Sequence, residues 1–337
     1  MKRVQSVLIA VSIGLATTSD FAHAITAASN WLQSLSELSP TSPASNLLPI
    51  KTEAMHEIGS RRVSAREETA LLDLVERFAG LRDRESALEI LRFLETKSVG
   101  YKKKSIQLKL DRVARVFFSS EGFNAYQEGL SLLTTSRAEE ARSRLMKAAD
   151  LEPSNVEVLI RMGQALVVLQ ESEAAISYLK KAFAFHPFRN EVTLWRGRAE
   201  FLAHGSVEAL PLLAAATKAL PGSETATLWY VEALAASTST SDQTQAVALL
   251  RSAVVKKPNS AVLRLQYAEL LKSRGAVALA RDEIRKVLGP EGAKGAESKS
   301  ALTFEPASAQ GDLGFQPYDL AQTMVRAQAV FAGLEGR

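Results

Sequence analysis

Apolar positions recur along the middle of the chain at the spacing of one helix face, and the pattern returns every 34 residues. Pro153, Pro187 and Pro221 mark this period. Ahead of each proline, the same residue types stand at the same offsets. The four columns are Gly129, Gly163 and Gly197; Ala141, Ala175 and Ala209; Leu145, Leu179 and Leu213; and Ala148, Ala182 and Ala216. An internal repeat of this length indicates stacked copies of one small structural unit.

Each unit is expected to be a hairpin of two helices. Ala141, Leu145 and Ala148 fall at i, i+4 and i+7, which places them on one face of the second helix. The glycine lies on the first helix, at the point where the two helix axes must come close. The proline follows the second helix and cannot continue it. Because such a hairpin cannot bury its own apolar face, it must stack on its neighbours.

Two less regular units follow the three clear ones. The fourth ends at Pro258, three residues later than the period requires, and the polar stretch from Ser237 to Gln243 accommodates the extra length. Its remaining columns are Ala246, Leu250 and Ala253, and a looser fifth unit has Ala268, Ala280, Ile284 and Val287. The pattern therefore predicts about five units over residues 122–290.

These columns resemble the tetratricopeptide repeat (TPR), which has small residues at repeat positions 8, 20 and 27 and proline at position 32. Gly163, Ala175, Ala182 and Pro187 meet that spacing, and the neighbouring units meet it too. The resemblance implies an all-α fold, a right-handed superhelical solenoid of TPR-type helical hairpins. The large aromatic residue of position 4 is missing, and Ala125, Leu159, Thr193, Thr227 and Arg264 stand there instead. This departure leaves the rotation of the first helices in the later units open.

The segments before the repeats differ from them in composition. Residues 1–24 have a basic start, an apolar run of about ten residues and a small-x-small ending, as a signal peptide has. An uncleaved anchor or a core helix is the alternative. Residues 25–63 are expected to be a flexible N-terminal segment, because 34–46 are rich in Ser and Pro. Residues 64–121 are expected to be a helical, degenerate repeat region that begins with a capping box of Ser64 and Glu67.

After the repeats, residues 291–317 are rich in Gly, Ala and Ser and are expected to form a loop. Residues 318–337 have helix-forming spacing, with Leu320, Met324, Phe331 and Leu334 as the apolar positions. The end of a solenoid exposes an apolar face that needs a cover. We therefore expect this last segment to be a C-terminal capping helix.

Composition excludes several classes of function. The chain has no Cys, which excludes disulfides, iron–sulfur clusters, thiolate zinc sites and catalytic thiols. It also has no H-E-x-x-H, no G-x-S-x-G and no Gly-rich phosphate loop. The net charge of +4 is too small to indicate nucleic acid binding. We expect no enzyme activity, no metal and no cofactor.

The resemblance also implies a binding surface, because the first helices of TPR proteins line a concave groove that holds a peptide. The corresponding residues here are Tyr126, Gln127, Arg161, Gln164, Trp195, Arg198, Trp229 and Glu232. With a shifted helix rotation, the two tryptophans would be core residues instead. The groove predicts a protein or peptide as the partner.

A second candidate surface is a basic cluster between residues 97 and 115. Its members are Lys102, Lys103, Lys104, Lys109, Arg112 and Arg115. The cluster could bind an anionic glycan or lipid, although such a run is usually one solvated helix face. The leading hypothesis is an exported, periplasmic or otherwise extracytoplasmic TPR scaffold that supports cell-envelope assembly or secretion. The alternative is a polysaccharide- or lipid-associated export component that uses the basic cluster.

Overall fold

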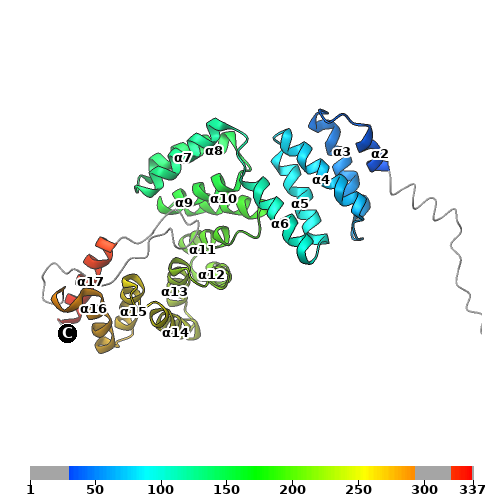
Figure 1. Cartoon of the computed structure of the whole chain (residues 1–337). Coiled ribbons are helices and arrows are strands. Elements are labelled where there is room, and N and C mark those ends of the chain that lie inside the picture. The colour runs from blue at the N-terminus through cyan, green and yellow to red at the C-terminus, as the bar shows by residue number, and fades with distance from the viewer. Residues whose placement is uncertain (1–29, 293–319, 336–337) are drawn as a thin grey trace, which may run out of the picture. The chain divides into compact units, whose positions relative to one another are not determined.

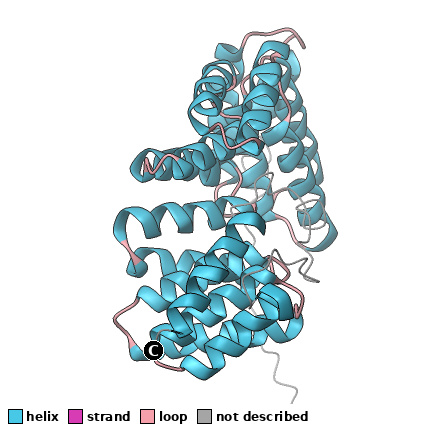
Figure 2. Cartoon of the chain, turned by 90° about the vertical axis from the view of Figure 1, so that its left-hand side faces the viewer, coloured by secondary structure: helices cyan, strands magenta, loops and turns pink. Residues whose placement is uncertain are grey.

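The computed structural model describes residues 30–292 and 320–335, and these residues form helices and no strand (Figures 1 and 2). The chain divides into two compact units between Val113 and Ala114. We describe each unit by itself. The predicted all-α architecture is confirmed.

Unit 1 contains five helices among its described residues. They are α2 (Asn30–Glu37), α3 (Ala44–Ile58), α4 (Ala65–Gly80), α5 (Arg84–Lys97) and α6 (Gly100–Arg115), whose last two residues belong to unit 2. α4 packs against α5, which confirms the degenerate hairpin predicted for this region. The interior is formed by large apolar side chains such as Trp31, Leu47, Leu71 and Phe78, all buried.

The prediction of a flexible segment over residues 25–63 is wrong, because α2 and α3 occupy much of it. The Ser- and Pro-rich composition is concentrated in the turn between these helices, at residues 38–43. On either side of that turn, apolar residues recur at helical spacing and are buried. They are Trp31 and Leu35 in α2 and Leu47, Ile50, Ala54 and Ile58 in α3. Their burial stabilises both helices against the interior of unit 1.

The predicted capping box at the start of α4 is confirmed. The Ser64 hydroxyl accepts a hydrogen bond from the Glu67 amide at 3.3 Å, and the Glu67 carboxylate accepts one from the Ser64 amide at 2.8 Å. Arg61 also binds this carboxylate, at 2.6 Å. The hydrogen-bonded Arg61 guanidinium lowers the pKa of Glu67 to about 2. Glu67 therefore joins the turn after α3 to the first turn of α4.

Unit 2 is a stack of helical hairpins that matches the predicted repeats. The hairpins are α7 (Ser120–Thr134) with α8 (Ala138–Leu151), α9 (Val156–Val168) with α10 (Ser172–Phe185), α11 (Asn190–His204) with α12 (Ser206–Ala219), α13 (Glu224–Ala236) with α14 (Thr240–Lys256), and α15 (Ala261–Ser273) with α16 (Val277–Gly292). Each second helix also packs on the first helix of the next hairpin. The four repeat prolines each follow a second helix, as predicted.

The glycine column marks the close crossing of the two helices in a hairpin. A Cβ atom added to Gly163 would lie 2.6 Å from Cγ of Leu179, which is too close for any real contact. Gly129 faces Leu145 and Gly197 faces Leu213 in the same way. The predicted role of the column is confirmed.

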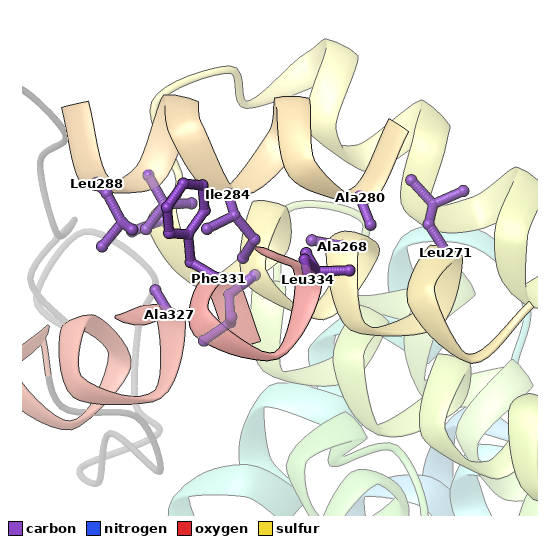
Figure 3. Close-up of a cluster of buried hydrophobic side chains, with 11 residues drawn as sticks. Ala268, Leu271, Ala280, Ile284, Leu288, Ala327, Phe331 and Leu334 are labelled. Carbon is purple, nitrogen blue, oxygen red and sulfur yellow. The ribbon is translucent and has the colours of Figure 1, made fainter. Parts of the chain in front are cut away.

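The C-terminal helix α17 (Leu320–Glu335) covers the last hairpin, as predicted (Figure 3). Its buried residues Ala327, Phe331 and Leu334 pack with apolar residues of α15 and α16. Arg281 of α16 donates a hydrogen bond to the Leu334 carbonyl at 2.7 Å. The loop predicted for residues 291–317 lies outside the described residues from residue 293 onwards.

Candidate protein-binding surface

The predicted groove residues lie on the first helices α7, α9, α11 and α13 of unit 2. Trp195 of α11 and Trp229 of α13 occupy equivalent repeat positions, and the structure brings their rings together. The ring centroids are 4.8 Å apart and the planes are inclined by 70°, which is an edge-to-face contact. Such a pair contributes roughly 0.5–1.5 kcal/mol beyond the burial of its area.

Most of the predicted groove residues are buried. Tyr126, Arg161, Gln164, Trp195 and Trp229 are each at most 7% exposed. They therefore do not form an open groove wall, and this corrects the expectation that they contact a partner directly. The missing aromatic of repeat position 4 gives the physical reason. Smaller or polar side chains stand there, and the two tryptophans supply the missing bulk between α11 and α13.

The remaining three predicted residues, Gln127, Arg198 and Glu232, reach the surface to different extents. The Arg198 side chain is 19% exposed and its guanidinium lies 2.7 Å from the Glu232 carboxylate, which is 45% exposed. The same guanidinium lies 5.5 Å from the ring centroid of Trp229 and 5.6 Å from that of Phe201. Arg198 thus connects the buried tryptophan pair with the surface through cation–π contacts.

A network of buried charges lies beside the tryptophan pair. Arg161 binds Glu191 at 2.7 Å, and Arg189 lies 2.9 Å from Glu157 and 3.1 Å from Glu191. Gln164 donates a hydrogen bond to Glu191 at 3.2 Å. Both glutamates and Arg189 were missed as site residues in the sequence. A signal was present, because Glu157 and Glu191 are 34 residues apart and so share one repeat position.

The charges of this network are stable only as a set. Burial raises the pKa of Glu191, while Arg161 and Arg189 oppose that shift. Burial by itself lowers the pKa of Arg161, but the neighbouring carboxylate of Glu191 outweighs it and the pKa is raised overall. Removing one member would leave an uncompensated buried charge, which is strongly destabilising. The network is therefore part of the internal structure of unit 2.

Most of the basic cluster is paired with acidic side chains. The pairs are Lys102 with Glu68 at 2.9 Å, Lys103 with Glu95 at 3.1 Å, Arg112 with Glu76 at 3.5 Å and Arg115 with Glu157 at 2.7 Å. Lys104 and Lys109 have no ion pair in the part of the chain that the structure describes. Because paired cations attract an anionic ligand less, this arrangement disfavours a glycan or lipid as the partner.

Two further observations concern residues 30–292 and 320–335. Within these ranges, no three His, Asp or Glu side chains are grouped so that they could hold a metal ion. None of the helices there is long and apolar enough to span a bilayer. The predicted signal peptide, residues 1–24, lies outside the described residues.

The stacked hairpins, the glycine crossings and the capping helix define a TPR-type helical-repeat protein. Similar solved structures include MamA, from residue 41 to its end, from Desulfovibrio magneticus RS-1, with 19% identity, 53% of this chain and 99% of that chain covered, and a TM-score of 0.45. Another is TTC0263, a thermophilic TPR protein in Thermus thermophilus, with 19% identity, 63% and 99% covered, and a TM-score of 0.47. No protein-family profile and no curated protein sequence matches the chain.

Proposed function

We propose that this protein is an exported, non-enzymatic scaffold that binds a protein or peptide partner on the face formed by the first helices of unit 2. We further propose that it acts in cell-envelope assembly or secretion. The observation that supports the binding site best is Arg198, which is partly exposed, lies over Trp229 and is held there by Glu232.

Arg198 is suited to bind a carboxylate of a partner. Its present partner, Glu232, is well exposed, and exposed ion pairs contribute only about 0–1 kcal/mol. A carboxylate on an incoming peptide can therefore replace Glu232 at little cost. An apolar side chain of the same peptide would cover Phe201, which is partly exposed next to Arg198. Arginine is also among the residue types most often found as binding hot spots.

Arg198→Glu is expected to reduce partner capture at least tenfold, because it replaces the carboxylate-binding cation with a repelling charge. The measurement is affinity capture of the tagged full chain from the native host, followed by mass spectrometry of the bound proteins. Glu232→Gln removes the internal competitor and is expected to increase capture of the same partner.

Arg144→Glu is the matched control, because Arg144 forms a comparable exposed pair with Glu128 on the α7–α8 hairpin, at 3.2 Å. This variant should capture the partner as the wild type does, and circular dichroism should show equal helical content in all variants. Equal capture by Arg198→Glu and Arg144→Glu would contradict the proposed site.

Export predicts a mature chain that begins at Ile25. The basic start, apolar run and small-residue site of residues 1–24 support this expectation. Intact-mass and N-terminal peptide analysis of protein from the native host should detect Ile25 as the first residue. Detection of the intact segment from Met1 to Ala24 in the accumulated protein would contradict it.

A further inference from the structure

The outer side of α14 carries a second face that the core does not use. Residues on this side line an open hollow of about 710 Å³, and Leu271, Arg274 and Ala276 form its other wall. The α14 residues are Thr244, Val247, Ala248, Arg251, Ser252, Val255 and Lys256. Their spacing is i, i+3, i+4, i+7, i+8, i+11 and i+12, which is one continuous stripe along a helix.

This stripe lies on the opposite side of α14 from its core contacts. Ala246, Leu250 and Val254 pack into the interior of unit 2. On the other side, Val247, Ala248 and Val255 give the stripe an apolar centre, and Val255 is 75% exposed. No described element packs over it. α14 therefore has two apolar faces, which is the pattern of a helix that packs against elements on both sides.

The shape of the hollow fits another helix. From Thr244 to Lys256 the stripe extends for roughly 18 Å, at about 1.5 Å for each residue. A helix of about three turns has this length, and its side-chain ridge would enter the groove beside α14. A membrane surface fits less well, because a hollow presents few protruding apolar side chains to a flat bilayer.

The charge around the hollow selects the partner. Arg251, Lys256 and Arg274 line it, and none of its lining residues is acidic. Arg274 donates a hydrogen bond to Gln243 at 3.3 Å. Arg251 and Lys256 have no ion pair within the described ranges. The outer helix α8 differs in this respect, because Arg142 there binds Glu139 at 2.7 Å.

We propose that this α14 face binds an acidic amphipathic helix of a partner protein. The apolar stripe of that helix lies in the hollow, and its carboxylates pair with Arg251, Lys256 and Arg274. This surface is separate from the face formed by the first helices, so the chain can hold two segments of one partner, or two partners, at once.

A labelled synthetic peptide tests the proposal. The probe is an 18-residue helical peptide with Leu at i, i+3, i+4 and i+7 spacing and Glu at the flanking positions. Its affinity for the full chain is measured by fluorescence anisotropy. The double variant Arg251→Glu/Lys256→Glu is expected to bind at least tenfold more weakly than the wild type. A control peptide with Lys in place of Glu should bind the wild type at least tenfold more weakly than the probe.

The matched control is Lys180→Glu/Lys181→Glu, which makes the same charge change on exposed positions of the outer helix α10. It should bind the probe as the wild type does. Arg198→Glu should also leave probe binding unchanged, so that a failure of this proposal is distinguishable from a failure of the proposed first-helix site.

Three results would overturn the proposal. The first is no binding of the probe to the wild type, or equal binding to the two double variants. The second is photo-crosslinking from position 255 that yields mainly adducts between two copies of this chain, because the α14 face would then be a self-association surface. The third is binding to phosphatidylglycerol vesicles that excludes the probe and is lost in Arg251→Glu/Lys256→Glu, because the occupant would then be lipid.

Discussion

Gly163→Leu is expected to destabilise unit 2 by roughly 1–3 kcal/mol or more, because overpacking at a close helix crossing forces the backbone to move. Even a Cβ atom at this position would lie 2.6 Å from Cγ and 2.7 Å from Cδ2 of Leu179. Leu179 is fully buried and has little space into which it can shift. Urea unfolding followed by circular dichroism should show the loss as a lower midpoint.

Gly222→Leu is the control for this substitution, because a Cβ at Gly222 meets no atom within 4 Å. Its unfolding midpoint should stay near that of the wild type. A second test adds Leu179→Ala to Gly163→Leu, which removes the clashing side chain and should recover part of the loss. Wild-type stability of Gly163→Leu alone would show that the repeat register is assigned incorrectly.

The repeats could be predicted from the sequence because close packing restricts residue size at fixed positions. Only glycine fits at Gly129, Gly163 and Gly197, where an added Cβ atom would lie less than 3 Å from a leucine side chain. A constraint of this kind acts on every unit alike, so it leaves columns at a constant spacing. The capping helix α17 could be predicted for a related reason, because an exposed apolar end requires a cover.

The N-terminal helices were missed because composition was averaged over a window that includes a turn. Within residues 34–46, the Ser- and Pro-rich turn hides the end of α2 and the start of α3. The apolar spacing from Leu47 to Ile58 is a helical signal that lies just after the averaged window. Periodicity, rather than composition, was the informative property of this segment.

The site residues were only partly predictable, because burial on a first helix depends on the rotation of that helix. Repeat spacing placed Arg161, Trp195 and Trp229 in one row, and the structure confirms that the two rings meet. Spacing alone does not determine whether such a row faces solvent or a neighbouring helix. The ion pair with Glu191, which makes Arg161 an internal residue, joins two different hairpins. It becomes evident only when those hairpins are stacked.

The burial of the tryptophan pair leads to the second large expected effect. Trp195→Ala with Trp229→Ala should strongly destabilise unit 2, since truncating one buried aromatic side chain costs about 3–5 kcal/mol. The two losses will not simply add, because the rings contact each other at 4.8 Å. Thermal unfolding monitored by circular dichroism should show an earlier loss of helix in the double variant.

Trp31 provides an internal control for this experiment, because it is the third tryptophan of the chain and is buried in unit 1. In the double variant it is the sole source of tryptophan fluorescence. Its unfolding transition should stay near that of unit 1 in the wild type, because the removed rings belong to the core of unit 2. A double variant with wild-type helix stability and no partner capture would mean the opposite. The rings would then be available to a ligand, and the direct contact role first predicted for them would be restored.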